Sequence, residues 1–269
     1  MLIRAGYDIR FEADGPVPVL ALLSVHPSRQ RDLRTTHRIT ASPDVPLYDF
    51  LDGFGNLCTR MTIPAGGIAL SCDILVEDSG EPDIVVPDAP QMAIEDLPDE
   101  VLQYLLASRY CETDRLLATA WSLFGNTQPG WARVQAIVDF THHHIAFGYH
   151  HARSNKTAWD AYQERQGVCR DFAHLAITLC RCVNIPARYC TGYLGDIGIP
   201  PIDAPMDFSA WFEVYLGGRW YTFDARHNRP RIGRILMARG RDATDAALTT
   251  HFGPALLTRF DVHTDDVTG

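Results

Sequence analysis

The run SAWFEVYLGGRWYTFDA constrains the fold of this chain more than any other stretch, because it fixes how two strands pair. Gly217 and Gly218 lie between two apolar and aromatic runs, a pattern typical of a two-residue β-hairpin turn with positive φ angles. With such a turn, Leu216 pairs with Arg219, and every later pair follows from that one. The sequence therefore predicts an antiparallel ribbon of known register.

This register brings position 209 close to Asp224. Continued pairing puts Trp211 opposite Asp224 and Ser209 opposite Arg226, with these side chains on one face of the ribbon. Ser209 is then a diagonal neighbour of Asp224, about 7–8 Å away at the backbone, a separation that long side chains can bridge. A serine side chain is too short to do so. A histidine at this position would reach the carboxylate.

The stretch GVCRDFAHLAITLCRCVNIP predicts the strongest helix of the chain, ending at Asn184 before Pro186. Cys169 follows Gly167 and opens this helix, where unpaired backbone N–H groups and the positive end of the helix dipole favour an anion. The position favours a nucleophilic thiolate at Cys169, and the same N–H groups could hold an oxyanion. A cysteine can equally be a small packing residue, and we expect packing roles for most of the cysteines.

The chain divides into a strand-rich part and a helix-rich part. Residues 1–77 contain short alternating runs separated by Gly, Pro and Asp, which predict an N-terminal β-sandwich. Residues 78–95 are rich in Pro and Asp and are interpreted as a connector. Residues 96–269 begin with helical patterns and continue with strands. We therefore expect an α+β fold, with helices packed on an antiparallel sheet in the second part.

Composition excludes several classes of protein. Apolar residues make up 46% of the 269 residues, as in an ordinary globular protein. The net charge of −9, with scattered Lys and Arg, offers no basic surface for nucleic acid. No run approaches the ~20 apolar residues of a membrane span, and no secretory signal opens the chain. We expect a cytoplasmic protein with reduced thiols, without a nucleic-acid or membrane partner.

Three motifs in a fixed order point to a family. The segments GVCRDFA, DFSAWFEVYL and WYTFDAR resemble those of the transglutaminase-like cysteine enzymes, a papain-like superfamily. The N-terminal strands resemble the β-rich region that precedes this core in many bacterial members. In that family the motifs carry a nucleophilic Cys, a His and an Asp, and the matching positions here are Cys169, Ser209 and Asp224. The chain departs from the family at the base, where Ser209 replaces the histidine.

The resemblance implies an acyl-transfer enzyme with a Cys169 thioester, acting on a peptide or a small amide or ester without a cofactor or metal. Hydrolase, peptidase and transamidase activities all stay open, as does the oligomeric state. Because a serine hydroxyl cannot accept the thiol proton, we expect this chain to be severely impaired. A replacement made to capture a bound substrate is favoured over a natural loss of activity, since the other catalytic positions remain. The alternative class is a non-catalytic binding protein with a degenerate site.

Other histidines are weaker candidates. His227 follows Asp224 by three residues and would point to the opposite face if the strand continued. His174 lies five residues after Cys169, turned ~140° around the helix. The histidines between 142 and 151 suit the negative end of a helix better than a metal, because adjacent side chains diverge. We therefore expect no metal site.

A few further side chains are candidates for the site. Gln163 precedes Cys169 and is predicted to assist the Cys169 backbone as an oxyanion donor. Trp159, Trp211 and Arg226 are candidates for substrate contact, and Arg226 suits a substrate carboxylate.

The Gly- and Pro-rich stretch GYLGDIGIPPIDAPMDF is predicted to form a loop that shapes the substrate pocket. It carries Asp196, Asp203 and Asp207. These acids either favour a cationic substrate or keep the loop solvated, and we favour the second reading.

Overall fold

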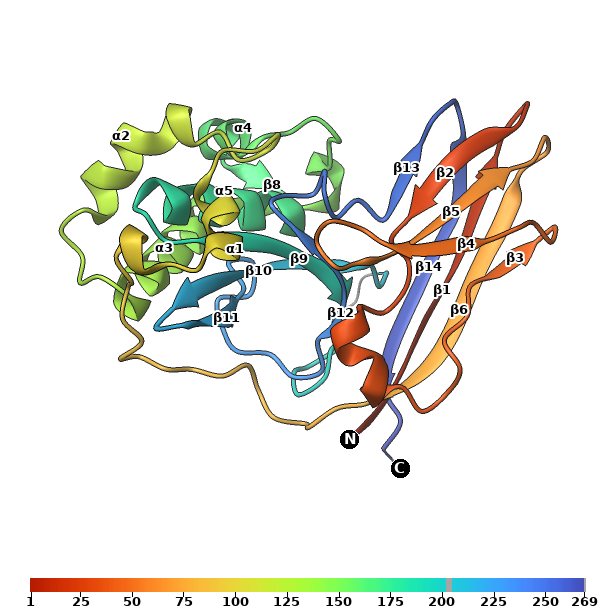
Figure 1. Cartoon of the computed structure of the whole chain (residues 1–269), viewed down its shortest axis with the longest axis horizontal. Helices are drawn as coiled ribbons and strands as arrows, with labels where there is room; N and C mark the ends of the chain where they lie inside the picture. The colour runs from red at the N-terminus through yellow and green to blue at the C-terminus, as the bar shows by residue number, and fades with distance from the viewer. Residues whose placement is uncertain (202–204, 269) are drawn as a thin grey trace.

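The computed structural model describes residues 1–201 and 205–268. Two sheets face each other in one part of the molecule, and helices cover a third, antiparallel sheet in the other part (Figure 1). The predicted α+β class is confirmed. Within the described ranges, no helix has the length and apolar character needed to cross a membrane.

The first part is a β-sandwich built from alternating strands. In β1, every second residue from Ile3 to Phe11 is buried between the sheets, as a half-buried strand requires. One sheet has the order β14-β1-β6-β3 and the other the order β13-β2-β5-β4. The strands are β1 (Leu2–Glu12), β2 (Val17–Ala21), β3 (Thr40–Ser42), β4 (Tyr48–Leu51), β5 (Leu57–Ile63), β6 (Ile68–Glu77), β13 (Thr249–His251) and β14 (Leu256–Asp266).

The C-terminal strands belong to this sandwich. β14 pairs antiparallel with β1 over most of its length, and β13 pairs with β2. Both ends of the chain consequently lie side by side (Figure 1). Residues 96–269 were predicted to form one second unit, but their last strands, β13 and β14, lie in the N-terminal sheets. Strand pairing between distant segments leaves no local signal, so the sequence could not indicate it.

The second part packs helices on the sheet β11-β10-β9-β12. Helix α5 is buried on all sides after its first turn and contacts β9, β10 and three other helices. The sheet consists of β9 (Ala187–Tyr193), β10 (Ser209–Leu216), β11 (Arg219–Phe223) and β12 (Ile235–Gly240). The helices are α1 (Asp99–Leu102), α2 (Thr113–Phe124), α3 (Trp131–His144), α4 (Ala158–Glu164) and α5 (Cys169–Cys182), and β7 (Ala146–Phe147) pairs with β8 (Gln166–Gly167). Short 3₁₀ turns are η1 (Pro27–Asp32), η2 (Ile94–Asp96), η3 (Gln103–Leu105) and η4 (Tyr149–His151).

The predicted hairpin is present with its predicted register. Gly217 and Gly218 have φ angles of 54° and 88°, and Leu216 pairs with Arg219. The pairing continues only to Phe223, where β11 ends. The predicted pairs beyond this point, which include Asp224, are therefore wrong.

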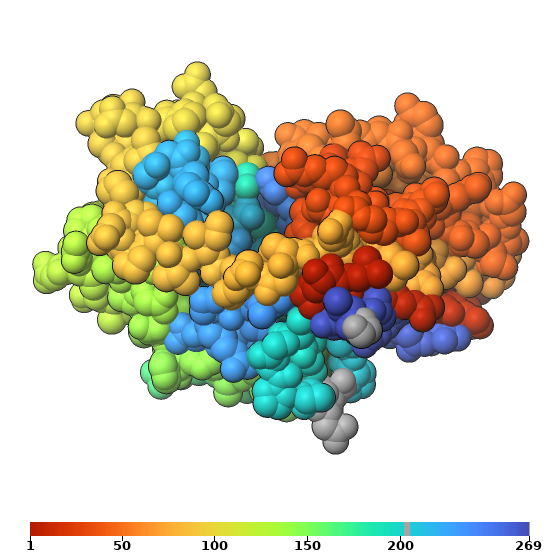
Figure 2. Space-filling model, turned by 90° about the horizontal axis from the view of Figure 1, so that it is seen from below, coloured from red at the N-terminus to blue at the C-terminus, as the bar shows by residue number. Residues whose placement is uncertain are grey.

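The connector 78–95 lies along the surface between the two parts, and Figure 2 shows it running across one face of the molecule. Pro90 accepts a hydrogen bond from Gly217 N–H at the hairpin turn, at 2.9 Å. Asp83 donates its N–H to the carbonyl of Arg231 at 3.0 Å. The connector is thus attached to the segment that follows β11 as well as to the hairpin.

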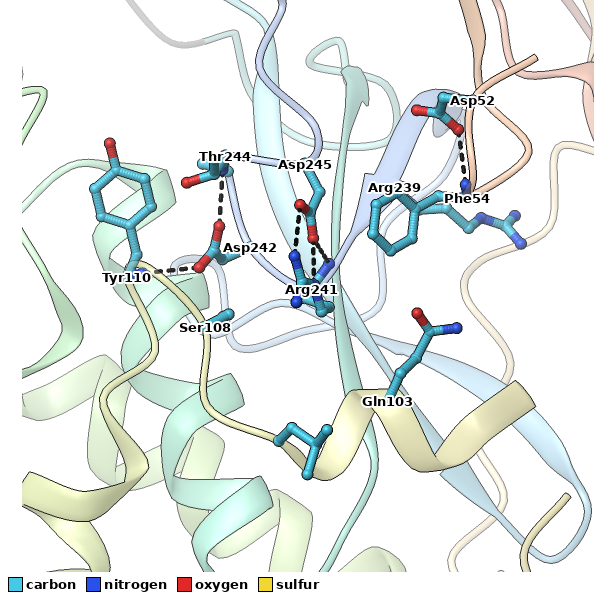
Figure 3. A network of polar contacts seen from close by, with 12 residues as sticks. Asp52, Phe54, Gln103, Ser108, Tyr110, Arg239, Arg241, Asp242, Thr244 and Asp245 are labelled. Carbon is cyan, nitrogen blue, oxygen red and sulfur yellow. Dashed lines mark hydrogen bonds and ion pairs between the residues drawn. The ribbon is translucent and has the colours of Figure 1, made fainter. Parts of the chain in front are cut away.

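A polar network around the buried Asp242 joins the segment after β12 to the loop that carries Tyr110 (Figure 3). Asp242 accepts hydrogen bonds from the N–H groups of Tyr110 at 2.7 Å and Thr244 at 2.8 Å. His174 Nε2 accepts the N–H of Ala243 at 3.1 Å, and its ring stacks on Tyr110. His174 is therefore a fully buried structural side chain. Its burial holds the imidazole pKa well below the ordinary value, although Asp242 opposes this shift.

The His174 site makes a prediction about acid stability. The depressed pKa means that the folded state excludes a proton that the unfolded chain binds below pH ~6.5, so stability is lost as pH falls from 7 toward 5. One such proton contributes at most about 1.4 kcal/mol per pH unit. We expect His174→Gln, which keeps an acceptor for Ala243 N–H, to show a shallower decline. Urea unfolding at pH 7, 6 and 5 measures this, and equal slopes would contradict it.

Candidate active site

Cys169 occupies the first position of α5. Asp171 accepts the N–H of Val168 at 2.9 Å and so caps the first turn. A Cβ at Gly167 would come within 2.7 Å of Asp171, so glycine is needed there for the close approach. All the cysteines lie in the described part of the chain, and Cys169 alone among them is not fully buried. The local sequence thus places one cysteine that is not fully buried at a helix N-terminus.

The surroundings of the Cys169 thiol do not favour the thiolate. Burial raises the pKa of Cys169 to about 11, while Arg226 and the backbone N–H of Ala210 act in the opposite direction. Burial therefore opposes the thiolate that the helix terminus favours, and the predicted thiolate at Cys169 stays a prediction. At neutral pH the thiol carries its proton, so any nucleophilic role requires a base.

Ser209 begins β10, directly before the Ala210 N–H that contacts the Cys169 sulfur. It pairs with Gly192 of β9 and is 6% exposed. Its side chain lines a small cavity of about 80 Å³. The structure therefore places position 209 next to Cys169, and its role in chemistry stays a prediction.

Asp224 and His227 form a hydrogen-bonded pair that the sequence analysis did not expect. Once β11 ends at Phe223, the chain turns, and Asn228 N–H donates to the Asp224 carbonyl at 2.8 Å. Asp224 Oδ1 accepts the N–H of Arg226 at 3.1 Å and of His227 at 3.0 Å. His227 Nδ1 lies 2.9 Å from Asp224 Oδ2. The prediction that His227 points away from Asp224 is wrong, because it assumed a continuing strand.

Asp224 also has a cationic partner. Arg234 Nη2 donates to Asp224 Oδ2 at 2.9 Å, and Arg234 Nε lies 2.9 Å from Asp83 Oδ2 on the connector. Burial alone would raise the pKa of Asp224, but Arg234 and then His227 outweigh it and hold that pKa well below its usual range. Asp224 is therefore an ionised carboxylate at neutral pH, although only 5% of it is exposed.

The cavity beside Ser209 gathers polar and aromatic side chains. Ser209, Arg226, His227 and Asp207 line it, together with Tyr149. The guanidinium of Arg226 lies 3.8 Å from the ring centroid of Phe147. Arg226 thus lies beside position 209, and its contact with a substrate stays a prediction. Asp203 of the same loop lies outside the described residues.

The other predicted site residues lie elsewhere. Trp211 is 2% exposed and faces a separate cavity of about 290 Å³, with Arg234 5.0 Å from its ring. Trp159 packs between Arg115 and Tyr162, and Gln163 is exposed on α4. Among the described residues that line the Ser209 cavity, none of these three occurs. Trp211 shares the face of Ser209 but lies two residues, about 7 Å, farther along β10, and it lines a different cavity.

The three histidines in the last turn of α3 contact backbone carbonyls. His142 Nδ1 lies 3.2 Å from the carbonyl of Ala225, and His143 Nδ1 lies 2.7 Å from that of Asp139. In the ranges that the structure describes, no group of three or more His, Cys, Asp or Glu side chains could hold a metal ion. The His142 contact instead helps to fix the turn that carries His227.

Comparison with known proteins identifies the class of domain. A model of the transglutaminase-like superfamily matches residues 118–225, a stretch that includes Cys169, Ser209 and Asp224. The crystal structure of a "putative cysteine protease" from Cytophaga hutchinsonii has a TM-score of 0.86 and 29% identity, covering 100% of this chain and 91% of that one. Residues 118–225 therefore form a transglutaminase-like domain, and the chain has a papain-like fold.

A second similarity covers a longer part of the chain than the matched domain. Over 234 residues the chain is 28% identical to an uncharacterized protein of Mycobacterium leprae (strain TN). The match covers 82% of this chain and 81% of the relative. The similarity thus extends well beyond the matched domain into the N-terminal strands.

Proposed function

We propose that this chain is a cysteine-dependent acyl-transfer enzyme in which Cys169 attacks an amide or ester carbonyl. One observation carries the proposal. The Cys169 sulfur lies at the N-terminus of α5, against the Ala210 N–H, and within the field of the buried carboxylate Asp224. The transglutaminase-like domain and the similarity to a structure described as a cysteine protease support this reading.

The chemistry passes through a thioester. Loss of the thiol proton to a base gives a thiolate, which attacks the carbonyl carbon and forms a C–S bond. The N–H of Cys169, at the first position of α5, is suited to hold the oxyanion, and Gln163 is a second candidate donor. Expulsion of the amine or alcohol leaves the acyl-enzyme, which water or an amine then cleaves. We place hydrolysis of a peptide or small amide first, and Arg226 is the candidate contact for a substrate carboxylate.

The expectation of an impaired enzyme depends on the state of Asp224. The chain is impaired only if Asp224 has no imidazole beside it. Ser209 cannot provide one, so the imidazole would have to come from another position. Asp224 does hold an imidazole, that of His227. We therefore propose an active enzyme, and the binding-protein alternative becomes an outcome of the experiment.

Acyl capture tests the proposal with p-nitrophenyl acetate as the acyl donor. We expect p-nitrophenol release and an acetyl mass increment on Cys169, and we expect Cys169→Ala to lose both by at least about a hundredfold. Cys72→Ala is the matched control, since burial also raises the pKa of that thiol to about 11 but it lies in the sandwich. Equal rates in the wild type and Cys169→Ala would leave a binding protein as the better description.

A further inference from the structure

The imidazole of His227 is held in one orientation by the turn after β11. The ring Nδ1 lies 2.9 Å from Asp224 Oδ2, and the backbone N–H of His227 donates to Asp224 Oδ1 at 3.0 Å. The side chain is 12% exposed. Two contacts to one buried carboxylate therefore fix both the backbone and the ring of this residue.

These contacts also set which ring nitrogen carries the proton. Asp224 is ionised and can only accept, so Nδ1 of the neutral ring is the donor. The other nitrogen, Nε2, then carries the free lone pair. It has no hydrogen-bond partner among the described residues, and His227 lines the cavity next to Ser209. A neutral imidazole with a carboxylate behind it is the usual form of a general base.

Cys169 does not line this cavity, but its sulfur interacts with residues at the cavity wall or next to it. Sγ contacts the N–H of Ala210, the residue after Ser209, and Arg226 acts on its charge. Both Ser209 and Arg226 line the cavity together with His227. His227 and Cys169 thus both lie near position 209, His227 through the cavity that Ser209 lines and Cys169 through the N–H of Ala210.

We infer that His227 is the general base of this enzyme and takes the place of the histidine that position 209 lacks. The inference rests on the proposed acyl-transfer function. The imidazole enters from the turn after β11 instead of from the start of β10, and it uses the same carboxylate, Asp224. Ser209 is then a small residue that leaves room for this ring.

The proton balance of the reaction follows. His227 Nε2 takes the proton of the Cys169 thiol as the C–S bond forms, and the resulting imidazolium gives it to the leaving amine as the C–N bond breaks. In deacylation, Nε2 takes a proton from water, the new C–O bond forms and the C–S bond breaks. The imidazolium then returns the proton to the sulfur. Water is the only co-reactant, and Asp224 stays ionised throughout.

Alkylation of Cys169 by iodoacetamide, followed from pH 6 to 11, tests base function without an acyl substrate. The variant His227→Asn keeps a donor for Asp224 but has no base, and His143→Asn is the control for loss of an exposed histidine nearby. We expect His227→Asn to slow alkylation at pH 7 by about 10²–10⁴-fold. Its rate then recovers only as the thiol itself ionises, near its pKa of about 11. Added imidazole is expected to accelerate His227→Gly but not the wild type.

The outcomes separate this inference from the proposed function. Unchanged alkylation and turnover at pH 7 in His227→Asn would overturn the inference and leave Cys169 chemistry in place. Alkylation that depends on His227, without any turnover of p-nitrophenyl acetate, would support the base and count against acyl transfer. A loss of alkylation that imidazole cannot restore in His227→Gly would show a structural role and overturn the inference. Circular dichroism of each variant establishes that it is folded.

Discussion

Replacing Arg234 with methionine is expected to lower the free energy of unfolding by about 3–5 kcal/mol, the usual effect of breaking a buried ion pair. Arg234 is 8% exposed and lies between two carboxylates, Asp83 and Asp224. Methionine fills similar space but leaves both carboxylates without a cation. His227 alone then faces the charge of Asp224, so we also expect the orientation of its ring to loosen and turnover to fall.

The pH dependence of this effect has a definite sign. In the wild type the depressed pKa of Asp224 contributes stability that is present above the unfolded value of about 3.9 and is lost as pH falls below it. Without Arg234, burial dominates and raises the pKa of Asp224, so the variant loses stability as pH rises. The difference in the free energy of unfolding between the wild type and Arg234→Met is therefore largest at neutral pH and decreases toward pH 4.

Urea unfolding at pH 7 and pH 4.5 measures both effects. Arg229→Met is the matched control, because Arg229 lies in the same segment but is exposed. The double variant Asp83→Asn with Arg234→Met removes one of the two carboxylates left without a cation. We expect it to regain part of the lost free energy of unfolding. If Arg234→Met and Arg229→Met differ by less than about 0.5 kcal/mol, the ion pairs do not stabilise the fold as argued.

Arg234 also links the site to the N-terminal sandwich. Arg29 of η1 donates to the Arg234 carbonyl at 2.8 Å and pairs with Asp78 at 3.1 Å. Asp83 belongs to the connector. The carboxylate behind His227 is therefore supported by residues from all three segments of the chain. A shortened chain that begins after the connector would lack two of these supports.

The sequence predicted the parts of the site that depend on local pattern. The turn chemistry of Gly217 and Gly218 fixed the hairpin register, and apolar spacing placed Cys169 at a helix start. The end of β11 was not predictable in the same way. It depends on Asp224 accepting two N–H groups of its own turn, and this turn competes with one more strand pair.

His227 was missed for the same reason. In a strand, an Asp and a His three residues later have their side chains on opposite faces. In a turn, the same two side chains can contact each other. The available sequence signal was Asn228 itself, because Asn tolerates the left-handed conformation that it adopts here, with a φ of 50°. Nothing in the sequence indicated that Arg234 pairs with Asp83, because the two residues are far apart along the chain.

Histidine introduced at position 209 is expected to raise activity only when His227 is absent. In the wild type the Oδ2 atom of Asp224 already contacts His227 and Arg234, so a second imidazole would compete for it. We expect Ser209→His alone to give no increase in turnover. In His227→Ala, which should lose about 10²–10⁴ in rate, adding Ser209→His is expected to restore at least tenfold, because the cavity of about 80 Å³ can receive the new ring.

The control for this rescue is Ser209→Asn in the His227→Ala background, which adds a side chain of comparable reach without a base. Turnover of p-nitrophenyl acetate and the rate of Cys169 alkylation are measured for all the variants. A large gain from Ser209→His in the otherwise unchanged chain would mean that Asp224 lacks a working imidazole, and the chain would then be an impaired enzyme. Rescue confined to the His227→Ala background would mean that Asp224 serves one imidazole at a time and that the chain carries its base at a different position.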